Sequence, residues 1–399
     1  MDYTQASYLF RARKAARYVS LYGLSRTLAK IRGQYHMLAA EEFAGARWVN
    51  AGCKDAGAPQ RCVALIGCGN YAYSSIAYYL SRHDSRFLRL AYDRHKSRAM
   101  SLCRAYGGAA AVADWREILA DPQVKVVFIA TNHASHAEYA QACIEAGKHV
   151  HIEKPHVVNR EQLQQLMFAM QRHPQVKVFL GFNRPRSSLF GQLQTLLHQQ
   201  SGPMMISWFV CGHETAAKPW YFNSSEGGVV LGNLCHWTDL TLQLVSLDKA
   251  FPCQIVPATP PGAISELVVS IIFADRSCAA ITFSSAKGHA FEGVREMLNI
   301  QKGNVIAALS DFQSLTVDAG AKKTVTRLRH RDHGHGANIV NSLDRSLAVD
   351  ACGEDSRYVA ATARLFLAIR EAIDTGETVS LSWDDIAAGP ARCPSGCEA

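Results

Sequence analysis

The segment from Gly227 to Asp239 holds the side chains whose types and spacing best suit acid–base chemistry. Asn233, His236 and Asp239 lie three residues apart, which on a helix would bring them along one side. A histidine titrates near neutral pH, so His236 could take a proton from a substrate hydroxyl or return one. Taken alone, however, a structural histidine with satisfied hydrogen bonds explains His236 better.

Two further polar segments follow apolar runs. Thr131–Glu138 follows the run 125–130, and Glu153-Lys154-Pro155 follows the run 148–152. At the carboxyl end of a strand in a doubly wound sheet, both would border the ligand cleft. There Lys154 would face the cleft, although the same pattern also describes a surface lysine before a proline turn.

A glycine-rich turn lies between a predicted strand and a predicted helix. Gly67 permits a tight turn, Gly69 lets the backbone approach a pyrophosphate, and Ala72 is small enough for close packing of the helix on the strand. The free N–H groups at the start of the helix would bind the phosphates. The turn therefore predicts a dinucleotide site, with an ordinary strand-to-helix turn as the alternative.

The residue that closes the next predicted strand bears on the choice of dinucleotide. A carboxylate at Asp93 would accept hydrogen bonds from the ribose hydroxyls. It favours NAD because it repels a 2′-phosphate. Arg94 and Lys96 follow directly and could bind that phosphate, so NADP remains an alternative.

The elements that must position these residues form an α/β pattern. Over residues 59–182, apolar runs alternate with helix-like segments, which predicts a Rossmann domain with a doubly wound parallel sheet. The predicted strands lie at 61–67, 87–93, 125–131, 148–155 and 176–182.

Residues 183–399 change character. Runs rich in β-branched and aromatic residues at 204–211, 265–274 and 277–285 predict an open, mostly antiparallel sheet in a C-terminal α+β domain. A helix is predicted over Ser356–Thr375, ending before Gly376, and a loose tail from about residue 387.

Residues 1–58 form a basic extension that is predicted to be helical and then irregular. Apolar residues recur at helical spacing, so the segment 7–32 could pack on the protein itself, on an oligomer partner or on an acidic lipid surface. We favour packing on the protein or its partner. The apolar positions are Leu9, Ala12, Ala16, Val19 and Tyr22.

The composition is that of a globular protein, with 48% hydrophobic and 19% charged residues in a chain of 399. The sequence contains no apolar run of membrane-spanning length and no secretory signal, so we expect a cytoplasmic protein. The twelve cysteines are scattered, which predicts buried free thiols rather than disulfides, and no cluster has metal-binding spacing. The net charge of +8 is not accompanied by a nucleic-acid recognition motif, so we expect no nucleic-acid partner.

Taken in order, the four segments resemble the Gfo/Idh/MocA family, named for glucose–fructose oxidoreductase and inositol dehydrogenase. The resemblance implies a Rossmann domain followed by a sheet domain that covers the nicotinamide and often mediates oligomers, so we expect a homo-oligomer. It implies cofactor contacts from a set of twelve residues and a cis peptide bond before Pro155. These residues are Gly67, Gly69, Asn70, Tyr71, Ala72, Asp93, Arg94, Thr131, Asn132, His136, Glu153 and Lys154.

The resemblance also implies that Lys154 and His236 handle the substrate hydroxyl, with Asn233 orienting it. The inositol dehydrogenase type has an Asp four residues before this histidine, where this chain has Gly232. The sequence around Gly232 is closer to a subgroup tied to polysaccharide and sugar-nucleotide biosynthesis. By the same comparison, the candidates for substrate contacts are Arg184, Trp220, Tyr221 and Asp239.

The function expected from these features is hydride transfer between a nicotinamide and a hydroxyl or keto carbon of a sugar, sugar nucleotide or cyclitol. Three alternatives stay open: an imine or enone reductase, a glycosidase or lyase that uses NAD transiently, and a non-catalytic regulator that binds NAD(P).

Overall fold

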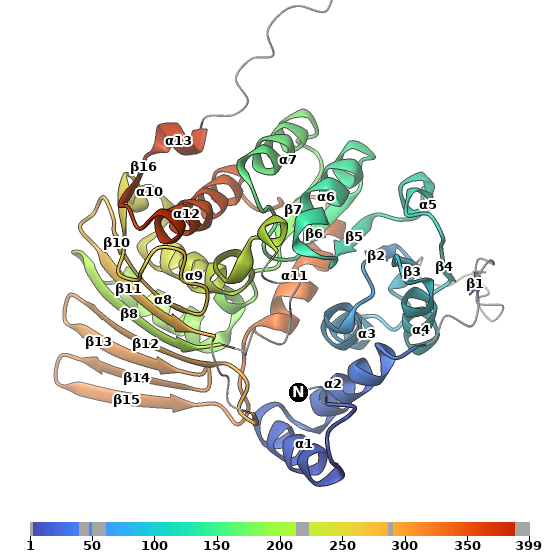
Figure 1. Ribbon diagram of the computed structural model, residues 1–399, viewed down its shortest axis with the longest axis horizontal. Coiled ribbons are helices and arrows are strands. Elements are labelled where there is room, and N and C mark those ends of the chain that lie inside the picture. Colours follow the sequence, from blue (N-terminus) through green and yellow to red (C-terminus); the bar gives the residue numbers. More distant parts are fainter. Residues whose placement is uncertain (1–2, 40–47, 50–60, 213–222, 286–289, 388–399) are drawn as a thin grey trace, which may run out of the picture.

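The computed structural model describes residues 3–39, 48–49, 61–212, 223–285 and 290–387. Two sheets stand side by side, and helices lie between and around them (Figure 1). Within the described ranges, no helix combines the length and apolar character needed to span a membrane.

The first sheet has the strand order β1-β4-β3-β2-β5-β6-β7. The strands from β4 to β7 pair in parallel, whereas β1 joins the edge antiparallel. The chain reverses its direction of winding at β2, and ligands bind beside such a reversal in doubly wound sheets. The predicted parallel sheet is confirmed. Its strands are β1 (Trp48–Val49), β2 (Val63–Ile66), β3 (Leu88–Tyr92), β4 (Ala110–Ala111), β5 (Val126–Ile129), β6 (His149–Ile152) and β7 (Val178–Leu180).

Helices bury both faces of this sheet. In β2, Ala64 and Ile66 pack into one hydrophobic core, and Val63 and Leu65 pack into another on the opposite face. This two-sided burial explains why the strand is a continuous apolar run rather than an alternating one. The helical segments are η1 (Ala72–Ala77), α3 (Tyr78–His83), α4 (Lys96–Tyr106), α5 (Arg116–Ala120), η2 (His133–Ser135), α6 (His136–Glu145) and α7 (Arg160–Arg172).

The second sheet has the order β15-β14-β13-β12-β8-β11-β10-β9-β16. All its pairs are antiparallel except β8 with β11. This confirms the open, mostly antiparallel sheet. Its strands are β8 (Met204–Cys211), β9 (Cys253–Pro257), β10 (Glu266–Ile272), β11 (Cys278–Ser284), β12 (Arg295–Lys302), β13 (Val305–Ser310), β14 (Ser314–Ala319), β15 (Lys322–Arg327) and β16 (Val379–Leu381).

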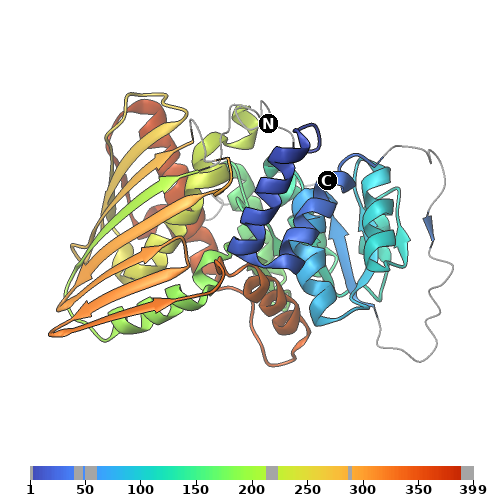
Figure 2. The same ribbon diagram turned by 90° about the horizontal axis from the view of Figure 1, so that it is seen from below.

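One face of the second sheet is covered by helices and the other is open (Figures 1 and 2). In β8, buried and exposed residues alternate, as expected for a strand with one covered face. The helical segments of this part are η3 (Arg184–Arg186), α8 (Ser188–His198), η5 (Ser224–Glu226), η6 (Val230–Leu234), α9 (Cys235–Val245), α10 (Leu247–Ala250), α11 (His335–Leu347), α12 (Ser356–Thr375) and α13 (Trp383–Ala387).

Two of these helices bear on the sequence predictions. Helix α12 begins and ends at the predicted residues, and Gly376 closes it at a positive φ of 77°. Helix α11 comes from the C-terminal part of the chain, yet its residues Ile339 and Leu343 lie in a core of the Rossmann domain. The C-terminal stretch therefore supplies a helix to the first domain, which no local pattern indicated.

The N-terminal segment forms two helices, α1 (Tyr8–Tyr22) and α2 (Leu24–His36), that lie between the two domains (Figures 1 and 2). Of the five apolar positions, Val19 and Tyr22 are half-buried within this chain, whereas Leu9, Ala12 and Ala16 are exposed. Helix α1 instead turns Lys14 and Tyr18 inward, because it borders a cleft rather than a dry core.

Candidate functional site

The glycine-rich turn has the geometry needed to approach a phosphate. Gly67 has a φ of 89°, and a Cβ there would overlap the backbone carbonyl of Ala130. Gly69, in contrast, faces open space, with no atom within 4 Å of a Cβ built on it. A continuous helix begins at Asn70, so its unpaired N–H groups point toward that space. The turn thus fits a dinucleotide pyrophosphate.

Asp93 lies directly after β3 and braces the same turn. Its carboxylate oxygens accept hydrogen bonds from the backbone N–H groups of Cys68, at 2.7 Å, and His95, at 2.8 Å. Each oxygen keeps acceptor capacity for a ribose hydroxyl. Arg94 is exposed.

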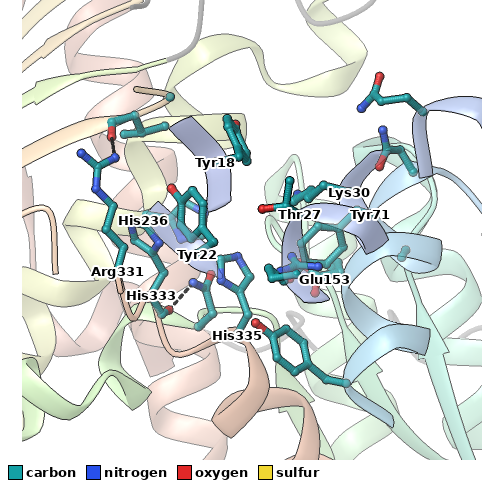
Figure 3. Close-up of a pocket in the computed structure, with 18 of the residues that line it drawn as sticks. Tyr18, Tyr22, Thr27, Lys30, Tyr71, Glu153, His236, Arg331, His333 and His335 are labelled. Carbon is teal, nitrogen blue, oxygen red and sulfur yellow. Dashed lines mark hydrogen bonds between the residues drawn. The ribbon is translucent and has the colours of Figure 1, made fainter. Parts of the chain in front are cut away.

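A cleft of about 830 Å³ opens between the two domains and the N-terminal helices (Figure 3). Its volume is that of a typical small-molecule site. Nine of the predicted site residues line it: Asn70, Tyr71, Thr131, His136, Glu153, Lys154, Arg184, Asn233 and His236. The predicted residues Gly67, Gly69, Ala72, Asp93, Arg94, Asn132 and Asp239 are not part of this lining.

Lys154 extends from the end of β6 toward the C-terminal domain. Its Nζ donates a hydrogen bond of 2.6 Å to the backbone carbonyl of Gly232. The Lys154–Pro155 peptide bond is cis, as the resemblance implied. Gly232 lies in η6, a π-helical segment, and π-bulges are frequent at functional sites. The backbone carbonyl of residue 232 thus accepts the lysine bond at the position where the inositol dehydrogenase type has an acid.

His236 is buried at the base of the cleft, and its Nδ1 is one of the buried side-chain atoms without a hydrogen-bond partner. Burial, followed by the nearby cations of Arg184 and Lys154, holds the pKa of His236 well below its usual value. The imidazole is therefore neutral at pH 7 and is able to accept a proton. The unpartnered nitrogen argues against the satisfied structural histidine.

Neighbouring side chains stabilise the cofactor side of the cleft. His136 is buried, with Nδ1 2.8 Å from the carbonyl oxygen of Pro155 and Nε2 3.2 Å from that of Thr131. It thus ties the loops after β5 and β6 together. The Asn132 side-chain amide donates a hydrogen bond of 2.8 Å to the Glu226 carboxylate. This bond joins the loop after β5 to the C-terminal part of the chain.

Arg184 lines the cleft, but its guanidinium is held by a buried carboxylate. It donates two hydrogen bonds to Glu296, at 2.7 and 3.1 Å, and lies over the ring of Trp237. Burial alone would raise the pKa of Glu296, but Arg184 and His333 outweigh it and lower that pKa to about 2. Arg184 therefore has a structural partner at the edge of the cleft. The predicted substrate residues Trp220 and Tyr221 lie outside the described residues.

Asp239 lies away from the cleft, so the structure does not support it as a substrate contact. It is fully buried against α12, where the Tyr358 hydroxyl donates to it at 2.5 Å and the Thr362 hydroxyl at 3.3 Å. Asn233, His236 and Asp239 do follow one another along helical segments, as predicted. Each step of three residues also turns the side chain around the helix axis, so Asp239 faces α12 rather than the cleft.

The environment of Asp239 gives a pH-dependent prediction. Burial raises its pKa from 3.8 to about 7, so the folded state holds the proton more tightly than the unfolded state, and stability falls as the pH rises from about 4 to 7. In Asp239→Asn the side chain cannot ionise, and its amide oxygen still accepts the hydrogen bond from the Tyr358 hydroxyl. We expect it to be more stable than wild type at pH 8, on the order of 2–4 kcal/mol, with the gap shrinking at pH 5.

Urea denaturation at both pH values measures this gap. Asp248→Asn is the matched control, because that carboxylate is 83% exposed. A gap of the same size at both pH values would contradict a raised pKa.

Two groups of lining residues were not predicted. Arg331, His333 and His335 follow β15, an edge strand of the second sheet, and the N-terminal helices contribute Tyr18 and Tyr22. Three histidines within 330–335 are a compositional signal that could have drawn attention to the first group. The N-terminal tyrosines carried no such signal, because their role depends on contacts with distant parts of the chain.

This geometry defines the chain as a two-domain protein with a dinucleotide-binding Rossmann domain and an antiparallel-sheet domain facing it. Residues 61–182 match the sequence model of the Gfo/Idh/MocA oxidoreductase family with an NAD-binding Rossmann fold. The Rossmann domain of this chain is therefore that of the Gfo/Idh/MocA oxidoreductase family.

Similar proteins agree with this placement. An inositol 2-dehydrogenase of Mycolicibacterium gilvum (strain PYR-GCK) is 28% identical over 203 residues, which is 50% of this chain and 57% of that protein. An inositol 2-dehydrogenase of Rhodococcus jostii (strain RHA1) is 26% identical over 202 residues, covering 50% and 54%. The chain thus matches little more than half the length of these curated relatives.

Solved structures share the whole fold at low identity. GenD2 from gentamicin A biosynthesis, in complex with NAD, gives a TM-score of 0.67 at 20% identity, covering 83% of this chain and 100% of that one. Levoglucosan dehydrogenase, in complex with NADH and L-sorbose, also gives 0.67 at 20% identity, covering 82% and 99%. The two-domain architecture is therefore shared with both of these solved structures.

Proposed function

We propose that the protein is an NAD-dependent oxidoreductase that transfers a hydride between nicotinamide and a hydroxyl or keto carbon of a sugar, sugar nucleotide or cyclitol. One observation carries the proposal: Lys154, His236 and the helix that begins at Asn70 border the same cleft. The inositol dehydrogenases among the relatives and the sugar-related solved structures support the substrate class.

The residues divide the work by position. Gly69 and the N–H groups from Asn70 onward hold the pyrophosphate, and Asp93 holds the adenosine ribose. Glu153, which is buried beside His151, lies by the nicotinamide ribose. Bound NAD supplies the hydride acceptor.

Side chains that line the cleft are proposed to transfer the substrate proton. Lys154 polarises the substrate oxygen, while neutral His236 takes the hydroxyl proton or returns it in the reverse direction. Asn233 lines the cleft one residue after Gly232 and orients the hydroxyl, because an amide donates and accepts hydrogen bonds but takes no proton.

The test is binding and turnover with purified protein. We expect NAD to bind more tightly than NADP, because of Asp93, and NADH to form with at least one member of a panel of inositols, sugars and sugar nucleotides. Calorimetry and absorbance at the NADH band measure the two. Glycosidic cleavage without net NADH would indicate the transient-NAD glycosidase or lyase, and tight NAD binding without any chemistry would indicate a regulator.

We also propose that the open face of the second sheet joins copies of the chain. Large apolar side chains are exposed there, at Met205, Phe209 and Ile306, with exposed fractions of 50–61%. Contiguous exposed apolar surface is typical of interaction sites. We expect Phe209→Glu to lower the mass of the native assembly, measured by light scattering. An unchanged mass would place the interface elsewhere, or show a monomer.

We propose a reducing, cytoplasmic location. Nine cysteines in the described part of the chain are free thiols, and five of them are buried. Structural disulfides are the rule in oxidising compartments, whereas buried free thiols are common in the cytoplasm.

A further inference from the structure

We propose that the N-terminal helix pair, α1 and α2, forms a third wall of the substrate site and favours a sugar that carries an acidic group, either a carboxylate or a phosphate. The proposal rests on the proposed function. It assigns a role to a segment that lies outside the residues matched by the family model.

Helix α1 is fixed to the C-terminal domain. Arg17 pairs with Glu292 at 2.7 Å, and the ring of Phe10 lies 5.1 Å from that of Phe291. The backbone N–H of Arg331 donates to the carbonyl of Leu21 at 2.8 Å. These contacts place α1 beside the segment that carries the cleft histidines His333 and His335.

Helix α2 is fixed to the Rossmann domain. His36 Nε2 lies 2.7 Å from the carbonyl oxygen of Cys68, within the glycine-rich turn. Arg26 donates to the Ser75 hydroxyl at 2.8 Å. Gly33 packs so closely that a Cβ there would lie 2.8 Å from the Asn70 side-chain oxygen. The pair therefore spans both domains, with its bend at Gly23.

The face that α1 turns to the cleft is aromatic and cationic. Lys14, Tyr18 and Tyr22 line the cleft, and the rings of Tyr18 and Tyr22 lie 5.3 Å apart. Figure 3 shows Tyr18 and Tyr22 on the same side of the cleft as His236, His333 and Arg331, facing Thr27 and Lys30 of α2. Aromatic rings suit the apolar faces of a sugar ring.

The charges around the cleft favour an anion. Its lining includes the cations of Lys14, Arg26, Lys30, Lys154, Arg184 and Arg331, and the carboxylates of Glu153 and Asp332. Arg184 pairs with the buried acid Glu296. Arg331 pairs with the buried Asp311 and with Glu292, which also pairs with Arg17. Lys14, Arg26 and Lys30 come from α1 and α2. A positive potential in a partly closed cleft raises the local concentration of anionic ligands.

The first experiment compares neutral and acidic sugars. Binding of D-glucose, D-glucuronate and D-glucose 6-phosphate to the protein–NADH complex is measured by calorimetry, together with any turnover. We expect the carboxylate, the phosphate or both to bind about 10- to 100-fold more tightly than the neutral sugar. The two acidic arms identify which group is recognised. Equal binding of all three would overturn the proposal.

The second experiment changes one cation and one ring, each with a control on the same helix. Lys14→Met is expected to abolish most of the preference for the acidic sugar, whereas Arg13→Met, on the exposed side, leaves it unchanged. Tyr22→Ala is expected to weaken sugar binding about tenfold, whereas Tyr8→Ala, at a residue that is 80% exposed, has no effect. NADH affinity is expected to stay at the wild-type value in all four variants. The melting temperature is expected to fall only in Tyr22→Ala, which loses the ring contacts with Tyr18 and His333.

The outcomes separate this inference from the proposed function. Suppose that the protein oxidises a neutral sugar and that neither Lys14→Met nor Tyr22→Ala changes sugar binding. The role of α1 and α2 in the substrate site would then be refuted, and the proposed oxidoreductase activity would stand. Selective binding of the acidic sugar without any redox chemistry would support the role of α1 and α2 in the substrate site and refute the proposed oxidoreductase activity. Loss of NADH affinity in Lys14→Met would assign that lysine to the cofactor and overturn its role in substrate choice.

Discussion

Lys154→Met is expected to lower turnover by about 10²- to 10⁴-fold while NAD still binds within a few-fold of wild type. Methionine keeps most of the side-chain stem and removes the ammonium group. In the structure that ammonium bonds to the Gly232 carbonyl at 2.6 Å and lies near enough to His236 to depress the histidine pKa. Its loss removes the group that polarises the substrate oxygen, and leaves the glycine-rich turn untouched.

Steady-state kinetics and NAD titration measure the two effects separately. Lys125→Met is the matched control, because this exposed lysine bonds to the Pro122 carbonyl at the opposite end of the sheet. If Lys154→Met kept wild-type kcat, the lysine would have no chemical role. If it lost NAD binding as well, the lysine would serve the cofactor rather than the substrate.

Arg184→Met is expected to destabilise the fold by about 3–5 kcal/mol at pH 7. The variant leaves Glu296 fully buried without the guanidinium that holds it, and an uncompensated buried charge is costly. Trp237, which donates to the same carboxylate at 2.9 Å, also loses the guanidinium stacked on its ring. By contrast, Arg160→Ala breaks an exposed pair with Glu371 and should cost less than about 1 kcal/mol.

The pH dependence of stability and a double variant test whether the unpaired charge of Glu296 destabilises Arg184→Met. The folded pKa of Glu296 is about 2 against an ordinary 4.5, so the stability it contributes is present above about pH 4.5 and is lost as the pH falls toward 2. Without Arg184 that pKa rises, so the deficit of the variant should narrow at acidic pH. Arg184→Met/Glu296→Gln should recover part of the stability, since glutamine still accepts from Trp237. Urea denaturation measures the free energy of unfolding of both variants. If Arg184→Met lost less than about 1 kcal/mol, the Arg184–Glu296 ion pair would not stabilise the fold as proposed.

The sequence predicted the parts that depend on local pattern. The run at 63–66 is buried on both faces and belongs to a parallel sheet, while the β-branched and aromatic run at 204–211 belongs to the mostly antiparallel sheet with one open face. The glycine turn was predictable because Gly67 must adopt a positive φ beside the Ala130 carbonyl. Helix α12 was predictable because Gly376 terminates it.

The parts that were missed depend on contacts between distant segments. The direction in which α1 faces is set by Glu292 and Arg331, which the periodicity of residues 7–22 does not contain. Asp239 shares a helix with His236, but its side chain is held by Tyr358, over a hundred residues later. Spacing on a helix gives relative angles, and only the packed neighbours decide which angle faces the cleft.

The bridge made by α1 also constrains the order in which the molecule is built. Arg17 and its partner Glu292 are separated by 275 residues, and Ser20 and His330 by 310. At about 5–20 residues per second, a ribosome exposes α1 tens of seconds before these partners exist. The Rossmann domain also depends on late residues, because Ile339 and Leu343 of α11 pack in its core. Helix α1 can make these contacts only once residues 292–331 have been synthesised, so the cleft is completed only after the C-terminal domain has emerged.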